Sequence, residues 1–198
     1  MAGTEQERES NTRSRILDVA ERLVQTRGFN GFSYADIAAE VRVTRASLHY
    51  HFAGKAELGE ALITRYTRRF TDALAAVDES VEDAPTRLDA YVGLYADVLR
   101  GQRMCLCGML AAEFETLPKP MQDAVIRFFD ESEAWLESVL EEGRQEGALQ
   151  FAEPAIEVAR LIVSSLEGAM LLARPYGDAL RFQTAASRLV ASLARAAE

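Results

Sequence analysis

Apolar residues recur every three or four positions along most of this chain, which is the spacing of one face of an α-helix. Long segments of this kind cover residues 12–27, 55–77, 85–101, 104–116, 121–146, 154–173 and 178–197, and two short ones lie between residues 33 and 52. No segment convincingly predicts a β-strand. The pattern therefore predicts an all-α fold of about nine helices.

Glycine and proline mark the predicted helix ends. Gly28 stands where the first helix needs a C-terminal cap. Pro85 suits the first turn of a helix, and Pro154 opens another. Pro118 interrupts the helical pattern, because a proline disfavours helix in the residue before it.

Two short helices joined by a tight turn are predicted between residues 33 and 52. Ser33 followed by Asp36 resembles a capping box at the start of the first helix. Thr44 can cap the second helix, 45–52, and only residues 41–43 separate the two. This arrangement predicts a helix-turn-helix.

The second short helix carries side chains suited to reading DNA. A helix fits the major groove, and an arginine fork matches guanine O6 and N7, which makes Arg45 the best candidate for a base contact. A solvated helix face is the alternative for each outward residue, Ser47 and Tyr50 above all. His49 and His51 point to different sides of the helix, which argues against a metal or catalytic site.

The charge distribution supports the same prediction. The net charge of the chain is −9. Residues 10–55 hold seven basic and four acidic residues, whereas residues 56–198 hold 14 basic and 24 acidic ones. A mildly basic segment 10–55 followed by an acidic segment 56–198 is compatible with DNA binding. Because the positive charge is modest, tight binding would also need a dimer or good base contacts.

Composition narrows the remaining classes. The sequence has no apolar run of membrane-spanning length, and its charged start lacks the apolar region of a secretory signal, so we expect a cytoplasmic protein without a membrane partner. Cys105 and Cys107 are the two cysteines, too few for a disulfide framework or a structural zinc site. We expect no metal and no cofactor, and no catalytic constellation is evident.

Residues 33–58 resemble the DNA-binding domain of the TetR family of bacterial regulators. The matching positions are Ser33, Ile37-Ala38, Val43-Thr44, Leu48, His51-Phe52, Lys55 and Leu58. Three positions depart from the family pattern: Arg42 and Ala46 replace glycines, and His49 replaces a tyrosine. Arg42 is therefore predicted either to adopt a left-handed backbone or to reach a phosphate.

The resemblance implies a division into a flexible N-terminus, 1–10, a helix-turn-helix domain, 11–55, and an effector-binding and dimerisation domain, 56–198. It also implies that a homodimer binds double-stranded DNA with a palindromic operator. The residues implied at phosphates are Ser33, Tyr34, Thr44, His49, His51 and Lys55, with Arg45, Ser47 and Tyr50 nearer the bases.

The last two helices are implied to form the dimer interface, because small residues there permit close approach. The candidates are Ile162, Ser164, Ser165, Leu166, Gly168, Ala169, Ala185, Leu189, Ser192 and Leu193. An ordinary intrachain core is the alternative.

A small-molecule effector is expected among the middle helices, where pockets are mostly apolar with a few polar anchors. The candidates are Tyr66, Phe70, Tyr91, Tyr95, Met104, Cys105, Met109, Glu113, Phe114, Phe128, Phe129, Trp135, Glu167 and Met170. Glu113 and Glu167 stand in apolar runs, so either is a candidate anchor for a polar or cationic effector; a structural salt bridge explains them equally well. For the other residues, packing in the core is the competing explanation.

Cys105 also resembles the sensing cysteine of a subgroup of the family, the NemR-like repressors. A thiol near a helix N-terminus, with Arg100 and Arg103 close in sequence, is predicted to react as the thiolate. The alternative is a small buried apolar side chain.

The sequence thus predicts a repressor that an effector releases from DNA. The rival hypotheses are a thiol-based sensor repressor, a helical interaction module without DNA binding, and an enzyme. The last is disfavoured.

Overall fold

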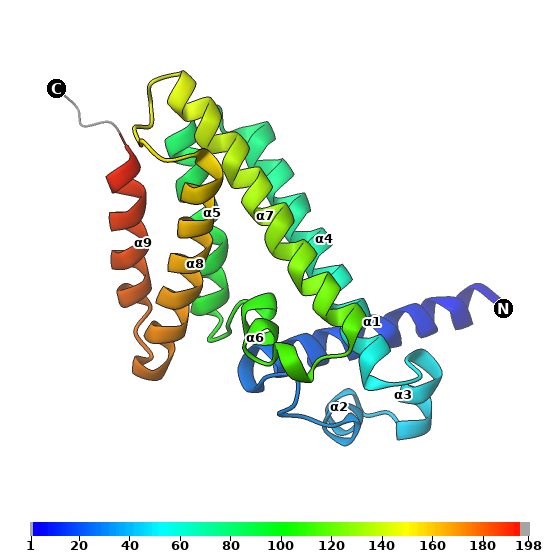
Figure 1. The fold of residues 1–198 in the computed structure, drawn as a ribbon. Helices are drawn as coiled ribbons and strands as arrows, with labels where there is room; N and C mark the ends of the chain where they lie inside the picture. The colour runs from blue at the N-terminus through cyan, green and yellow to red at the C-terminus, as the bar shows by residue number, and fades with distance from the viewer. Residues whose placement is uncertain (1, 195–198) are drawn as a thin grey trace. The chain divides into compact units, whose positions relative to one another are not determined.

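The computed structural model describes residues 2–194, and of residues 2–6 and 8 it describes the backbone alone. The described part holds nine α-helices and two short 3-10 helices and no strand, which confirms the predicted all-α fold (Figure 1). The α-helices are α1 (Ala2–Arg27), α2 (Tyr34–Val41), α3 (Arg45–His51), α4 (Lys55–Ser80), α5 (Ala84–Arg100), α6 (Leu106–Ala112), α7 (Lys119–Gln145), α8 (Ala155–Ala173) and α9 (Ala179–Leu193). The 3-10 helices are η1 (Phe114–Thr116) and η2 (Arg174–Tyr176).

The chain divides into two compact units. Unit 1 comprises Met1–Thr67 and Leu106–Val125, and unit 2 comprises Arg68–Cys105 and Ile126–Glu198. Residue 55, where the sequence placed a domain boundary, lies inside unit 1. Helix α6 also belongs to unit 1, where it packs against α1.

The core of unit 1 forms where α1, α2 and α3 meet. Ile16 and Leu23 of α1, Ile37 of α2 and Leu48 of α3 are all exposed by 1% or less. Phe52, directly after α3, is fully buried as well. Burying each such side chain contributes about 1.5 to 3 kcal/mol, so this small core fixes the angle between the two short helices.

Several predicted helix ends are confirmed. Gly28 follows α1 with a φ of +82°, a conformation that glycine adopts without a steric cost. Pro85 lies in the first turn of α5. Asp178 caps α9 by accepting a hydrogen bond from the backbone N–H of Leu180 at 3.0 Å.

Other boundaries differ from the prediction. Residues 2–10 are helical where a flexible segment was expected, because glutamate, glutamine and arginine extend a helix already anchored downstream by Ile16 and Leu17. The segment 104–116 forms α6 and then η1, since Leu117 before Pro118 is extended. Helix α9 ends at Leu193, and the predicted continuation to residue 197 lies outside the described residues.

Unit 2 is built around α5, α8 and α9, which pack against one another (Figure 1). Tyr91 of α5, Leu166 of α8 and Phe182 of α9 are fully buried. Leu136 and Leu140 of α7 are fully buried too. Helices from both ends of the unit's sequence therefore share one core.

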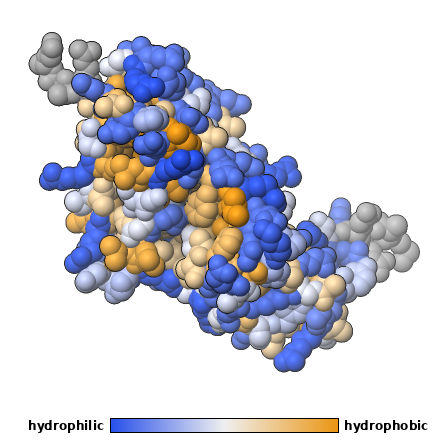
Figure 2. Space-filling view, in the orientation of Figure 1, coloured by the Kyte–Doolittle hydropathy of each residue, from blue (hydrophilic) through white to orange (hydrophobic). Residues whose placement is uncertain are grey.

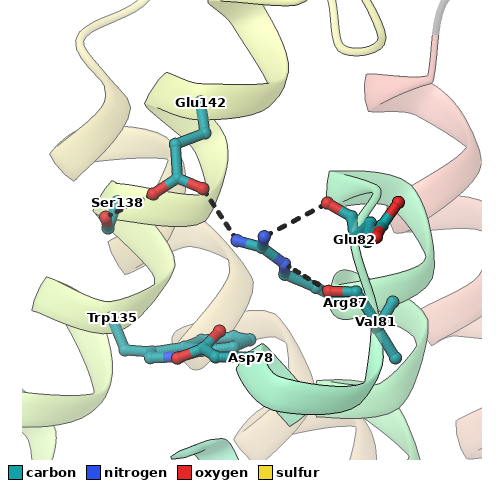
Figure 3. A network of polar contacts seen from close by, with 7 residues as sticks. All are labelled: Asp78, Val81, Glu82, Arg87, Trp135, Ser138 and Glu142. Carbon is teal, nitrogen blue, oxygen red and sulfur yellow. Dashed lines mark hydrogen bonds and ion pairs between the residues drawn. The ribbon is translucent and has the colours of Figure 1, made fainter.

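Arg87 closes the turn between α4 and α5 (Figure 3). Its guanidinium donates to the carbonyl oxygens of Val81 and Glu82 at 3.0 and 3.1 Å. The same group forms an ion pair with Glu142 of α7 at 2.7 Å. One side chain thus satisfies two carbonyl groups that follow the end of α4 and ties the turn to α7.

Candidate functional site

Helix α2 begins with a reciprocal cap. The Asp36 carboxylate accepts hydrogen bonds from the backbone N–H and from the hydroxyl of Ser33, each at 2.7 Å. The Ser33 hydrogen bonds hold the pKa of Asp36 below its ordinary value. The predicted capping box is confirmed.

The turn between α2 and α3 uses a left-handed residue. Arg42 has φ 61° and ψ 48°, which confirms the conformation predicted from the arginine standing in place of a glycine. This backbone costs a residue with a Cβ about 1 kcal/mol. The Arg42 side chain is exposed, so it stays available outside the turn.

Helix α3 is capped, and its outer face is exposed. The Thr44 hydroxyl accepts a hydrogen bond from the backbone N–H of Ser47 at 3.1 Å, as predicted. Leu48 is fully buried, whereas Arg45 and Tyr50 face solvent. Among the side chains that the structure describes, those of residues 7 and 9–194, none forms a hydrogen bond or ion pair with the Arg45 guanidinium. The helix therefore holds an uncommitted cation on a fixed support.

Two further candidates brace the end of α3. The Tyr34 hydroxyl donates to the carbonyl of Phe52 at 3.2 Å, and its ring lies 5.0 Å from the His49 ring. The His49 Nδ1 lies 3.1 Å from the carbonyl oxygen of Ala53. Burial, with a contribution from Glu57, raises the pKa of Tyr34 to about 12, so the phenol stays neutral.

Tyr50 contacts the segment that the sequence assigned to a flexible N-terminus. Its hydroxyl donates to a carboxylate oxygen of Glu9 at 3.0 Å. Its ring packs edge-on against His51, with centroids 5.4 Å apart. Sequence reasoning missed Glu9, because a polar segment without apolar periodicity gave no reason to extend α1 so far.

Lys55 is turned towards the loop between α1 and α2. Its ammonium group donates to the carbonyl oxygens of Phe29 and Phe32, the latter at 2.6 Å. It also lies over both rings, 4.6 and 4.1 Å from their centroids. Burial lowers the pKa of Lys55, and the Glu113 carboxylate opposes that shift. The residue expected at a phosphate thus makes its contacts inside unit 1.

Glu113, at the end of α6, fastens the same loop. Its carboxylate accepts hydrogen bonds from the backbone N–H groups of Phe29 at 2.5 Å and Asn30 at 3.2 Å. The Asn30 amide also donates to the Thr116 hydroxyl at 2.8 Å. A Cβ at Gly28 would lie 2.9 Å from the Glu113 carboxylate. Glu113 is therefore a structural acceptor in unit 1. Three other predicted effector residues, Tyr66, Met109 and Phe114, also belong to unit 1.

A cluster of aromatic rings in unit 2 brings five predicted effector residues together. We call it the aromatic cluster, and it comprises Phe70, Tyr91, Tyr95, Phe128 and Trp135. Trp135 stacks on Tyr91 with centroids 5.6 Å apart, and Phe70 lies 5.1 Å from Phe128. The structure therefore brings these five rings together, and their role at an effector site stays a prediction.

Hydroxyl groups give the aromatic cluster a polar centre. The Tyr91 hydroxyl is hydrogen-bonded to Ser132 at 2.5 Å and to the Tyr95 hydroxyl at 3.3 Å. Burial raises the pKa of both tyrosines, so they remain neutral donors and acceptors. Ser132, which is almost completely buried on α7, was not predicted from the sequence. A serine among apolar residues at helical spacing was the available signal.

Glu167 of α8 faces this polar centre. Its carboxylate is hydrogen-bonded to the Cys105 thiol, and burial raises its pKa to about 7. Its Oε1 atom is buried and has no hydrogen-bond partner among the described residues. The charge of Glu167 also raises the pKa of Tyr91 and Tyr95.

Four more predicted effector residues, Met104, Cys105, Phe129 and Met170, also belong to unit 2. Phe129 packs edge-on against Phe128 at 5.3 Å, and the other three are buried. Among the described side chains, those of residues 7 and 9–194, no group of three or more histidine, cysteine, aspartate or glutamate residues is arranged to hold a metal ion. No helix in that range combines the length and the hydropathy of a membrane span.

Comparison with protein-family models matches both parts of the chain. Residues 16–62 match the model of the bacterial regulatory proteins of the tetR family, and residues 84–189 match that of the tetracyclin repressor-like C-terminal domain. The chain belongs to the TetR family.

Known members of the TetR family resemble this chain over nearly all of its length. A TetR regulator from Agrobacterium tumefaciens has 30% sequence identity and a TM-score of 0.92, covering 94% of this chain and all of that one. One from Legionella pneumophila has 34% identity and a TM-score of 0.79, covering 90% and 95%. The transcriptional repressor NemR of Escherichia coli is 27% identical over 84% of this chain and 85% of its own.

The predicted dimer residues of this TetR-family chain fall into two groups. Ile162, Leu166 and Leu193 are buried in the core of unit 2, which was the alternative that the sequence left open. The exposed or half-buried members are Ser164, Ser165, Gly168, Ala169, Ala185, Leu189 and Ser192.

Four large apolar side chains that the sequence analysis did not select are exposed on the same two helices. They are Leu161, Leu171, Leu172 and Leu180, whose exposed fractions lie between 56% and 69%. Figure 2 shows apolar surface where α8 and α9 lie in Figure 1. A groove of about 610 Å³ between these helices is lined in part by Leu172, Leu180 and Ala185. The signal in the sequence was that leucines of α8 also occupy positions outside its buried face, where the core of one chain does not cover them.

Proposed function

We propose that this TetR-family regulator is a repressor that binds a palindromic operator as a homodimer and leaves it when unit 2 binds a small molecule. The observation that carries the proposal is the capped, exposed helix α3 with the uncommitted guanidinium of Arg45. A helix that is fixed by its cap and its buried Leu48 can enter the major groove without first being ordered.

In this proposal, different side chains of the helix-turn-helix contact the bases and the phosphates of the DNA. Arg45 contacts a guanine, and Ser47 and Tyr50 lie nearest to neighbouring bases. Ser33, Arg42, Thr44, His49 and His51 lie at phosphates. Tyr34 and Lys55 act indirectly, because their hydrogen bonds hold the end of α3 and the loop before α2.

A second copy of the chain completes the reading unit. One short helix reads only a few base pairs, and a two-fold dimer places a second helix about 34 Å away, or a multiple of that distance. The exposed leucines of α8 and α9 support this arrangement, since apolar side chains of that size gain free energy when a partner covers them. A substitution of Leu172 by glutamate is expected to yield monomers in sedimentation equilibrium.

An effector acts through its different affinities for two conformations of the dimer. The aromatic cluster supplies an apolar site, and the hydroxyl groups and Glu167 supply polar anchors. Binding there favours the conformation in which the two α3 helices are wrongly spaced for the operator. No catalytic step belongs to this cycle.

The thiol-sensor hypothesis has weaker support. Cys105 is buried, with an exposed fraction of 2%, and its thiol is hydrogen-bonded to the Glu167 carboxylate. A neighbouring carboxylate disfavours the thiolate that reacts with electrophiles. Arg100, one of the two cations expected to assist, forms an ion pair with Asp97 instead.

Selection from a pool of random DNA duplexes tests the proposal. The full-length protein is expected to enrich a palindromic sequence and to bind it with an affinity that falls steeply between 50 and 200 mM salt. The Leu172→Glu variant is expected to lose most of that affinity while its circular dichroism remains helical. Enrichment of no sequence, or enrichment of a single half-site by a monomer, contradicts the proposal.

A further inference from the structure

The polar centre of unit 2 contains one atom without a partner. In the described part of that unit, Glu167 Oε1 is the buried side-chain atom that makes no hydrogen bond. The other groups around it are satisfied, since Tyr91, Tyr95 and Ser132 bond to one another. A buried acceptor left without a partner costs about 1 to 3 kcal/mol, and more when it is charged. The described residues therefore leave room at this atom for a partner from outside them.

No positive charge among the described residues balances Glu167. The groups that interact with its carboxylate are the Cys105 thiol and, on α5, the hydroxyl groups of Tyr91 and Tyr95. All three are neutral or acidic, and no arginine or lysine of the described residues forms an ion pair with Glu167. The missing partner of this carboxylate is thus a hydrogen-bond donor or a cation.

The surrounding rings favour the cation. The faces of tryptophan, tyrosine and phenylalanine rings carry negative electrostatic potential and attract cations. The charge of Glu167 raises the pKa of Tyr91 and Tyr95, and both tyrosines belong to the aromatic cluster with Phe70 and Trp135. Phe70 and Trp135 are only half-buried, so the cluster reaches the surface of the protein.

We propose that the effector is a hydrophobic cation, an aromatic or alkyl molecule with one amine or quaternary ammonium nitrogen, whose charge pairs with Glu167 Oε1. This inference rests on the proposed function, because it names the class of molecule that releases the repressor. The rings of the aromatic cluster cover the hydrophobic part of the ligand, and Cys105 holds the second carboxylate oxygen in place.

The pairing has a pH signature. Burial keeps the Glu167 carboxyl group protonated until the pH approaches about 7, whereas a cation requires the ionised form. Binding therefore displaces a proton below that pH. The affinity for a permanently charged ligand is expected to rise with pH, by up to tenfold per unit below about 7, and to level off above it.

Three matched probes test the charge requirement by calorimetry on the full-length protein. They are benzyltrimethylammonium, its neutral isostere 2,2-dimethyl-1-phenylpropane, and the anion phenylacetate. At pH 8 we expect the cation to bind at least tenfold more tightly than the neutral probe, and the anion to bind most weakly. Trp135 is the single tryptophan of the chain and stacks on Tyr91, so its fluorescence provides an independent titration.

Two variants distinguish the effect of the Glu167 carboxylate on ligand binding from that of removing any acidic side chain of α8. Glu167→Gln is expected to abolish both the preference for the cation and its pH dependence while affinity for the neutral probe is retained. Glu157→Gln removes an exposed carboxylate of the same helix and is expected to change neither. Equal binding of the cation and the neutral probe, unchanged cation binding by Glu167→Gln, or no binding of any probe overturns the inference.

Operator binding without any probe keeps the two proposals apart. Glu167→Gln is expected to bind the selected duplex as well as the original protein does, and benzyltrimethylammonium is expected to release only the latter. If the duplex is bound but no cation releases it, this inference fails and the proposed function stands. If the cation binds through Glu167 but no duplex is ever selected, the proposed function fails.

Discussion

Glu113 and Glu167 are both glutamates within apolar stretches of the sequence, and they differ in how many of their carboxylate oxygens have hydrogen-bond partners. Glu113 accepts two backbone hydrogen bonds in unit 1, whereas Glu167 leaves one oxygen without a partner in unit 2. From their sequence contexts alone the two residues were equivalent candidates for an effector anchor. The difference shows that partners, and not burial, decide whether a carboxylate is structural or available to a ligand.

The same contrast extends to the surroundings of each residue. The loop fastened by Glu113 is also held by Lys55, so the helix-turn-helix begins from a fixed point. The centre around Glu167 consists of hydroxyl groups and a thiol, which can exchange partners without breaking a helix. A rigid helix-turn-helix and an adaptable polar centre fit the division between DNA binding and effector binding that we propose.

The largest effect is expected from removing the acceptor in unit 1. Glu113→Ala leaves the N–H groups of Phe29 and Asn30 without their charged acceptor, which should lower the free energy of unfolding by about 3 kcal/mol or more. Urea denaturation measures this loss. Glu115→Ala, an exposed neighbour in η1, is the matched control and should change stability by less than about 0.5 kcal/mol. Similar losses of unfolding free energy in the two variants would contradict the structural role assigned to Glu113.

The second effect concerns pH. Glu167 has a pKa raised to about 7 in the folded protein, against an ordinary value of 4.5, so the folded state holds its proton more tightly. Stability is therefore greatest at low pH with respect to this group and falls as the pH rises from about 5 to about 8. The loss from this residue is on the order of 3 kcal/mol.

The Glu167→Gln variant isolates that contribution. Urea denaturation at several pH values is expected to show a flatter stability profile for the variant between pH 5 and pH 8, and equal or greater stability at pH 8. A profile parallel to that of the original protein would mean that Glu167 is ionised and satisfied in the folded state.

A smaller effect is expected from Gly28→Ala. Alanine would have to adopt the left-handed φ of +82° that Gly28 has, and its Cβ would lie 2.9 Å from the Glu113 carboxylate. The free energy of unfolding should therefore fall by about 2 kcal/mol. Combining it with Glu113→Ala removes the close approach and should cost less than the sum of the two single changes, which a double-mutant cycle measures. Strict additivity would show that the loop and Glu113 are independent.

The smallest effect is expected from Lys55→Met, which keeps an apolar stem but leaves the carbonyl oxygens of Phe29 and Phe32 without a donor. A loss of about 1 kcal/mol in urea denaturation is expected. If Lys55 instead bound a phosphate and nothing else, stability would not change and only the salt dependence of operator binding would fall.

Local patterns made most of the fold predictable. The caps at Ser33, Thr44 and Asp178 and the left-handed Arg42 each depend on residues only a few positions away. Helix α1 was predicted ten residues too short, because a polar segment shows no apolar periodicity even when its residues favour helix.

The candidate sites depend on contacts distant in sequence, so they were less predictable. The partners of Glu113 are 83 and 84 residues away, and no spacing rule connects them. The aromatic rings could be listed as a set because all lie on inward helix faces, whereas Ser132 was passed over as one small polar residue. The exposed leucines of α8 were concealed because buried and exposed apolar residues look alike in sequence.

Operator affinity of an Arg45 variant tests the central claim, that α3 reads DNA. With the duplex selected by the original protein, fluorescence anisotropy at fixed salt compares Arg45→Ala with Arg127→Ala, which removes an equally exposed arginine of α7. Loss of a guanine contact in each half-site, at about 1 to 3 kcal/mol apiece, predicts at least a tenfold weaker Kd for Arg45→Ala. The Arg127→Ala variant is expected to match the original protein. Equal affinities for the two variants would contradict the account.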